Sequence, residues 1–448
     1  MYNEQLDLEQ QLGSFDVGER RKALGKLHEM LNTAQVSAVP EFPAVNLHCH
    51  TFFSFNAYGY SPSAYAWEAK KRGLYAVGTV DFDVLDGVEE FLEATELLGI
   101  RAVAGMESRV IIPEWRERVI NSPGEPGIYY FMGTGFDRGS PGLRSSHEGL
   151  RNMHHLAQQR NRTMIDKINT YLRDIMLDYE EDVVPLTPAG NPTERHILVA
   201  LYRKAELQFP DAARRARFWA DAMELKTGEV LALSERPVDL QMHIRSKLMK
   251  KGGPGYTLPD DRSFPSLEYM TKVVLDLHGI PTHTWLDGTT EGERDAGGML
   301  DFIMAEGAAC MNIVPDRNWN LADPDDRDRK VGRLHEVVDE AEKRNLPIIV
   351  GTEMNKHGQG FVDDFFAGPM RQVREVFMRG ARIMTGHTTL MRAMGIGLLD
   401  DAVRERFGGD MKKRNDFFEQ IGALQPESSP GGLEELRQSV KKIWEKGV

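Results

Sequence analysis

Short apolar runs alternating with amphipathic helical stretches constrain the fold of this chain more than any other feature. The runs have the length of β-strands, and most are separated by a stretch with the 3.6-residue periodicity of a helix. This alternation predicts parallel strands joined by helical crossovers, and therefore an α/β fold. The runs lie at residues 45–47, 74–80, 100–105, 280–285, 308–314, 346–350 and 381–385.

A pair of histidines closes the first run. His48 and His50 are two residues apart, so on a strand both imidazoles project to the same face. Imidazole is a common protein ligand for zinc and related metals. Further ligand-type side chains stand at the ends of later runs, where sites of α/β folds are built. These are Asp81, Glu107, His283 and Glu353.

One long segment interrupts the alternation. Residues 145–251 are charged and helical with few strand signals, which is long for ordinary connecting helices, so we predict an inserted helical cap. Around it we predict an α/β barrel formed by residues 42–144 and 252–400. A helical extension is expected at residues 1–41 and a helical tail at 401–448.

Composition narrows the classes of partner. The net charge of −13 argues against nucleic acid as a stable partner and against anionic membranes, since both need a basic face. No apolar run reaches membrane-spanning length, and the N-terminus lacks the pattern of a signal peptide. Two cysteines exclude a disulfide framework and favour the reducing cytoplasm. We therefore expect a cytoplasmic protein; its oligomeric state stays open.

Several motifs resemble the PHP (polymerase and histidinol phosphatase) family of metal-dependent phosphoesterases. Residues 48–51, His-Cys-His-Thr, resemble the family's opening motif, and residues 79–87 resemble its second. Residues 104–107 are similar to its Gly-x-Glu motif, and residues 279–283 to a later histidine-bearing strand. The resemblance implies a distorted TIM-like (β/α)7 barrel. The insertion is similar to that of nucleoside 3′,5′-bisphosphate phosphatases and 5′–3′ exoribonucleases.

The chain departs from the family pattern at several ligand positions. Phe82, Tyr130 and Asn355 stand where metal-binding histidines are expected, and Glu353 replaces the usual aspartate. Phenylalanine cannot bind a metal, and tyrosine or asparagine replaces imidazole poorly. The resemblance therefore implies one intact ligand set for a divalent ion, with a second ion as the alternative. Its members are His48, His50, Glu107 and Glu353.

The residues suggest roles around such an ion. Two imidazoles and two carboxylates suit Zn²⁺, Mn²⁺ or Fe²⁺. Asp81 and His283 are predicted either to complete the ligand shell or to transfer protons, and Arg317 to stabilise charge on the substrate. A further group at expected strand ends is predicted to contact substrate. It comprises Arg109, Asn355 and His387.

Three functions are compatible with this pattern. The first is a metal-dependent phosphoesterase acting on a small phosphorylated substrate, as the resemblance implies. The second is a mononuclear hydrolase or lyase acting on a non-phosphorylated, sugar-like or carboxylated substrate, which the three lost histidines favour. The third is a non-catalytic binding protein with a residual metal. Because ligand types persist around one metal position, the third ranks last.

Overall fold

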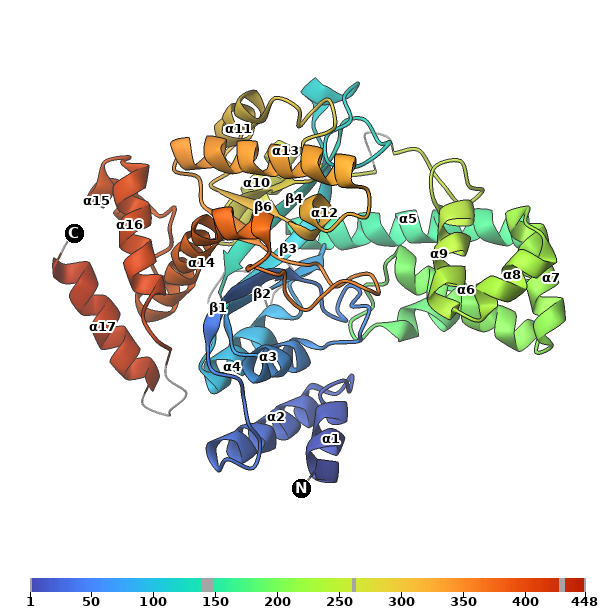
Figure 1. Cartoon of the computed structure of the whole chain (residues 1–448), viewed down its shortest axis with the longest axis horizontal. Coiled ribbons are helices and arrows are strands. Elements are labelled where there is room, and N and C mark those ends of the chain that lie inside the picture. Colours follow the sequence, from blue (N-terminus) through green and yellow to red (C-terminus); the bar gives the residue numbers. More distant parts are fainter. Residues whose placement is uncertain (1, 138–147, 260–262, 427–431, 447–448) are drawn as a thin grey trace. The chain divides into compact units, whose positions relative to one another are not determined.

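The computed structural model of the chain describes residues 2–137, 148–259, 263–426 and 432–446 (Figure 1). It contains two compact units. The first comprises residues 1–52, 56–150 and 265–448, and the second comprises residues 53–55 and 151–264. The predicted boundary between barrel and cap at residue 145 lies outside the described residues.

A seven-stranded sheet forms the centre of the first unit. Its strands follow one another in chain order, and neighbours are parallel except at β4, which is antiparallel to both β3 and β5. The strands are β1 (Phe42–Cys49), β2 (Leu74–Phe82), β3 (Arg101–Ile111), β4 (Ile128–Phe136), β5 (Ile280–Trp285), β6 (Cys310–Ile313) and β7 (Ile348–Val350).

Backbone hydrogen bonds join the two ends of this sheet. The N–H of Glu353, just after β7, donates to the carbonyl of His48 at 2.7 Å, and the N–H of His50 donates to the carbonyl of Glu353 at 2.9 Å. Gly351 permits this approach, because a Cβ there would overlap the backbone nitrogen of His48. The predicted TIM-like barrel is therefore confirmed.

Two details of the predicted strand pattern are wrong. The sequence predicted parallel strands throughout, whereas β4 runs antiparallel. Residues 381–385 were predicted to be a strand but lie inside the long helix α14 (Gly368–Met394). A short apolar run fits a buried helix as well as a strand, and here the periodicity of the longer segment decides.

Helices cover the outside of the barrel. Figure 1 shows α3 and α4 on one side of the strands and α11 and α13 on the other. Local signals fix their ends: Ser61 accepts a hydrogen bond from the Ala64 N–H at the start of α3, and Gly99 ends α4 in the left-handed conformation. The helices of this unit are α1 (Tyr2–Gln11), α2 (Val17–Asn32), α3 (Pro62–Lys71), α4 (Val88–Leu98), α10 (Leu267–Asp276), α11 (Ala296–Ala305), α12 (Asp316–Trp319), α13 (Pro324–Lys343), α14, α15 (Asp401–Phe407), α16 (Met411–Gly422) and α17 (Gly432–Lys446).

The second unit is helical and has its own apolar core. Ile168, Leu201 and Trp219 are among the fully buried side chains of that core. His196 closes a capping box with Thr193 at the start of α6. The helices are α5 (Glu148–Leu172), which begins in the first unit, α6 (Glu194–Gln208), α7 (Ala212–Met223), α8 (Thr227–Ser234) and α9 (Pro237–Ile244). Among the described residues, no helix has the length and apolarity needed to span a membrane.

A buried ion pair connects the N-terminal helices to the barrel. The Arg20 guanidinium on α2 bonds both oxygens of Glu90 on α4, and these side chains are 2% and 6% exposed. Glu90 also accepts a hydrogen bond from the Ser63 hydroxyl at 2.6 Å. Because both charges are withdrawn from water, neither can lose its partner without a large cost.

We predict that Arg20→Ala lowers the free energy of unfolding by about 3–5 kcal/mol, because Glu90 would be left buried without its cation. Urea denaturation followed by circular dichroism measures the change. Arg21→Ala is the matched control: Arg21 pairs with Glu93 on the surface with 53% of its side chain exposed, so its loss should cost less than about 1 kcal/mol. Equal effects of the two substitutions would contradict the prediction.

Candidate metal centre

The last residues of β1 place two imidazoles inside the barrel. His48 and His50 are fully buried, and both face the Glu107 carboxylate at the end of β3. The Nε2 atom of His50 lies 3.4 Å from Oε2 of Glu107, and the Nε2 atom of His48 lies 3.8 Å from it. The ligand atoms of these three residues all lie within 4.8 Å of one another.

This geometry fits a single divalent ion. Two ligand atoms that bind one ion at about 2.1 Å in tetrahedral geometry lie about 3.4 Å apart, close to the observed separations. The Nδ1 atom of His48 lies 2.7 Å from Oδ1 of Asn312 on β6. If Nδ1–H donates to that oxygen, the Nε2 lone pair is directed at Glu107, and Nε2 has no hydrogen-bond partner within the described chain. We refer to His48, His50 and Glu107 as the metal cluster.

The charges in the cluster favour a cation. Burial raises the pKa of Glu107, but the adjacent His48 and His50 rings outweigh this effect and lower it to about 2. Burial lowers the pKa of His48, yet the Glu107 and Glu353 carboxylates raise it above its ordinary value overall. Glu107 therefore stays ionised, and the positive charge that it attracts can come from a proton on His48 or from a metal ion.

Two residues at expected histidine positions line the same interior. Phe82 stacks on the His50 ring, with centroids 4.4 Å apart and planes 27° from parallel. Tyr130 on β4 pairs with Arg109 on β3, two residues beyond Glu107. Paired residues of an antiparallel ladder share a face, so the Tyr130 and Glu107 side chains lie on one face of the sheet. Neither substitution supplies another imidazole.

The Glu353 carboxylate is bound by an arginine. Nη2 of Arg317, on α12, donates to both Glu353 oxygens at 2.7 Å. Burial raises the pKa of Glu353, but Arg317 and His48 lower it below its ordinary value overall. Glu353 is thus anchored beside the metal cluster by its backbone, while its carboxylate faces Arg317. Its carboxylate is not among the ligand atoms that lie within 4.8 Å of one another, so the structure does not bring Glu353 into the metal cluster as the predicted fourth ligand.

His283 does not face the metal cluster, contrary to the prediction. In the β5–β6 ladder, Thr284 pairs with Asn312, which reaches His48 in the interior. Thr284 therefore faces inward and His283 outward, since alternate residues of a strand face opposite sides. His283 instead bonds the Tyr129 hydroxyl through Nδ1, and burial lowers its pKa to about 3. The sequence-based assignment missed the register by one residue.

Asp81 also faces away from the interior. Cys49 pairs with Thr79 in the β1–β2 ladder, so Thr79 and Asp81 share the outward face of Cys49. The Asp81 carboxylate accepts hydrogen bonds from the Thr51 N–H and hydroxyl, both at 2.7 Å. Asp81 thus fixes the turn that follows His50, and the structure does not bring it into the metal cluster.

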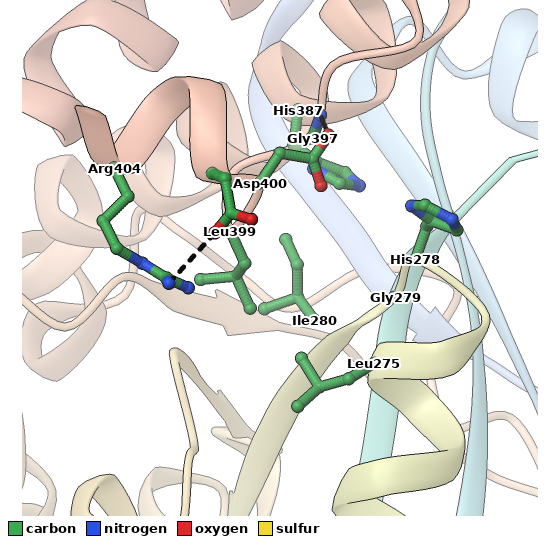
Figure 2. Close-up of a pocket in the computed structure, with 10 residues that line it drawn as sticks. Leu275, His278, Gly279, Ile280, His387, Gly397, Leu399, Asp400 and Arg404 are labelled. Carbon is green, nitrogen blue, oxygen red and sulfur yellow. Dashed lines mark hydrogen bonds and ion pairs between the residues drawn. The ribbon is translucent and has the colours of Figure 1, made fainter. Parts of the chain in front are cut away.

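His387 lies at the opposite end of the barrel from its predicted place. It lines a cavity of about 430 Å³ beside Ile280 at the start of β5 (Figure 2). Its Nε2 atom lies 2.7 Å from the Gly135 carbonyl, and its Nδ1 accepts a hydrogen bond from the Leu398 N–H at 2.9 Å. The prediction was wrong because residues 381–385 are helical, so His387 does not follow a strand.

The remaining predicted contact residues lie near the mouth. Arg109 shares the inward face of β3 with Glu107, and its Nη1 lies 3.3 Å from Oε2 of Glu125. Asn355 is half-buried, two residues after Glu353. Sequence reasoning missed Asn312, although an amide within the apolar run 308–314 is a recognisable signal of a polar contact in the core.

Three comparisons with known proteins bear on this centre. Residues 46–228 match the family model described as PHP domain. An error-prone DNA polymerase from Cutibacterium acnes is 32% identical over 85 residues, which make up 19% of this chain and only 8% of that polymerase. The PHP match and the metal cluster support a metal-dependent hydrolase.

Two solved structures align with this chain at low sequence identity. An amidohydrolase from Chromobacterium violaceum, with bound sulfate and no metal, is 18% identical with a TM-score of 0.48, over 74% of this chain and 95% of that one. A protein described as a metal-dependent phosphoesterase from Bifidobacterium adolescentis is 16% identical with a TM-score of 0.44, over 75% of this chain and 98% of that one.

The register of β5 generates a prediction about metal binding. His48→Gln removes an imidazole from the metal cluster and should abolish stoichiometric binding of Zn²⁺ or Mn²⁺. His283→Gln alters an equally buried histidine that faces outward, so metal binding should be unchanged. Metal content after dialysis and isothermal titration measure both, and circular dichroism checks folding. Loss of metal in folded His283→Gln protein would contradict the assigned register.

A buried carboxylate beside α12 makes stability depend on pH. Burial, and then the neighbouring Asp316 carboxylate, raise the pKa of Asp363 from 3.8 to about 8. The unfolded chain therefore releases this proton near pH 4, whereas the folded chain keeps it to about pH 8. Between these pH values the folded state binds more protons than the unfolded state. The contribution of Asp363 to the free energy of unfolding therefore falls as pH rises.

We predict that Asp363→Asn removes this loss of stability. The difference in free energy of unfolding between variant and wild type should grow from about pH 4 to pH 8, in favour of the variant. Its upper bound is about 6 kcal/mol, from about 1.4 kcal/mol per pKa unit. Urea denaturation at several pH values measures it, with the exposed Asp328→Asn as control. A difference that does not vary with pH would exclude the raised pKa as the cause.

Proposed function

We propose that this chain is a metal-dependent hydrolase of the PHP type that cleaves a phosphate ester of a small molecule. The convergence of His48, His50 and Glu107 around one point carries the proposal. These residues come from two strands, their ligand atoms are separated as one ion requires, and a third strand fixes the His48 ring through Asn312. Zn²⁺, Mn²⁺ and Fe²⁺ all accept this donor set.

The protein's own residues hold the metal ligands in fixed positions. His48, His50 and Glu107 would hold a divalent ion, which would lower the pKa of a bound water and polarise a substrate oxygen. His48 and His50 hold fixed positions because β1 is bonded to Glu353 on one side and β2 on the other. Phe82 covers one face of the His50 ring and excludes water from it. Asp81 holds the turn after His50 through Thr51.

A second candidate function uses the same cluster with a different substrate. Phe82 supplies no ligand atom, and Glu353 is engaged by Arg317, so the described residues offer one compact ligand group and support one ion. A phosphate ester needs its remaining oxygens stabilised by other cations. A mononuclear hydrolase or lyase acting on a carboxylated or sugar-like substrate needs fewer cations around its substrate. The single compact ligand group therefore favours this second candidate.

Metal analysis combined with an activity screen tests the proposal. Protein purified without added metal should contain about one divalent ion per chain and hydrolyse phosphate monoesters. His50→Ala and Glu107→Gln should lose the ion and at least about 10²-fold of the activity together. His155→Gln, which changes an exposed histidine on α5, is the control and should retain the ion and the activity. A wild-type protein with one ion that turns over no phosphate ester would favour the second candidate; a protein that binds no ion would exclude both.

A further inference from the structure

Positive charge lies beside the metal cluster at the mouth of the barrel. Arg109 follows Glu107 by two residues on the inward face of β3, and Arg317 projects from α12 onto Glu353. The backbone of Glu353 is hydrogen-bonded between His48 and His50, at 2.7 and 2.9 Å. The Arg317 guanidinium is therefore linked to the two histidines through one intervening residue.

Arg317 has donor capacity to spare. Both of its bonds to Glu353 come from Nη2, and within the described chain Nε and Nη1 donate no hydrogen bond. Its side chain is 42% exposed, whereas Glu353 is 10% exposed. The outer edge of the guanidinium thus faces the solvent side of the mouth, where a ligand can approach it.

Tyr130 places a neutral donor in the same area. Its ladder partner is Arg109, and the pair shares the inward face with Glu107. Within the described chain its hydroxyl makes no hydrogen bond. Burial raises the pKa of this phenol, and the positive charges of Arg109 and Arg317 oppose that rise. The phenol therefore keeps its proton and can donate it in a hydrogen bond.

We propose that Arg317 and Tyr130 form an oxyanion-binding subsite beside the metal cluster, which receives the non-bridging oxygens of a phosphoryl group. This inference rests on the proposed function and names the part of the site that selects the substrate. Arginine suits the role because its planar fork donates two parallel hydrogen bonds to phosphate or carboxylate oxygens. Arg109, held by Glu125, adds positive potential without having to touch the ligand.

A divalent ion at the cluster would strengthen anion binding at this mouth. Glu353 pairs with Arg317 and Glu125 pairs with Arg109, while Glu107 carries a further negative charge inside the cluster. An ion held by the cluster would add two positive charges beside these groups, so an anion should bind more tightly to the loaded site than to the unloaded one.

Binding of inorganic phosphate to the full-length protein tests the subsite. With metal present, Arg317→Ala should weaken phosphate binding about tenfold or more, because a charge-assisted hydrogen bond is lost. Tyr130→Phe should weaken it about threefold to tenfold, since it removes one neutral donor and keeps the ring. Arg329→Ala, on the exposed face of α13, is the matched control and should bind phosphate as wild type does. Isothermal titration gives the affinities.

Metal content, measured on every sample, separates this inference from the proposed function. Variants that keep their metal and bind phosphate as wild type does would overturn the subsite while the metal-dependent hydrolase stands. A wild-type protein that takes up no metal would remove the proposed function. The subsite would then be retained only if metal-free protein binds phosphate through Arg317, and it would be overturned if it does not.

Two further arms complete the test. Arg317→Lys keeps the charge but loses the planar fork of donors. Phosphate affinity between those of wild type and Arg317→Ala would support direct contact of Arg317 with the anion. If the alanine variant does not fold, the phosphate affinity of Tyr130→Phe decides. Malonate replaces phosphate in a parallel titration. Tighter Arg317-dependent binding of malonate than of phosphate would overturn the assignment to phosphoryl oxygens and favour the carboxylated substrate. No saturable binding of either anion to metal-loaded wild type would overturn the subsite.

Discussion

The two hydrogen bonds between Glu353 and the end of β1 are the constraint on which the site depends. They join the last strand segment to the first, and they do so at the carbonyl of His48 and the N–H of His50. Closure of the barrel and placement of the metal cluster are therefore one structural event. Because the side chains of β1 alternate, fixing its backbone also fixes which residues face inward, and a slip by one residue would exchange His50 for Cys49.

Buried polar side chains on and beside the strands are paired by hydrogen bonds. Asn46 donates to the Thr352 hydroxyl at 3.0 Å, and the Thr134 and Thr282 hydroxyls lie 2.8 Å apart. Asn312 contacts His48 in the same way. Buried polar groups with partners specify one arrangement, since any shift in register would leave them unsatisfied. The Asn312 contact therefore orients the His48 ring before any ion binds.

Much of the fold and part of the site could be predicted from the sequence, and the errors share a cause. Strand-length runs and the His48–His50 spacing depend on local periodicity, which sequence shows directly. The direction of a side chain on a distant strand depends on register, which sequence does not show. His283 and Thr284 are neighbours in one apolar run, and only pairing with β6 decides that the threonine faces inward. The predicted position of His387 was wrong for a related reason, because a five-residue apolar run does not distinguish a strand from a buried helix.

Glu353 illustrates how one carboxylate can serve two cations. Its oxygens are both bonded by Nη2 of Arg317, yet its backbone lies between the two histidines of the metal cluster. A charge of minus one can neutralise a guanidinium or complete a metal shell, and a buried carboxylate without either partner would be strongly destabilised. Arg317 is partly exposed and so can leave Glu353 at little cost in desolvation. If an anionic substrate draws the guanidinium to itself, the released carboxylate would be free to turn toward the ion. Substrate binding and completion of the ligand shell would then be coupled through a single arginine.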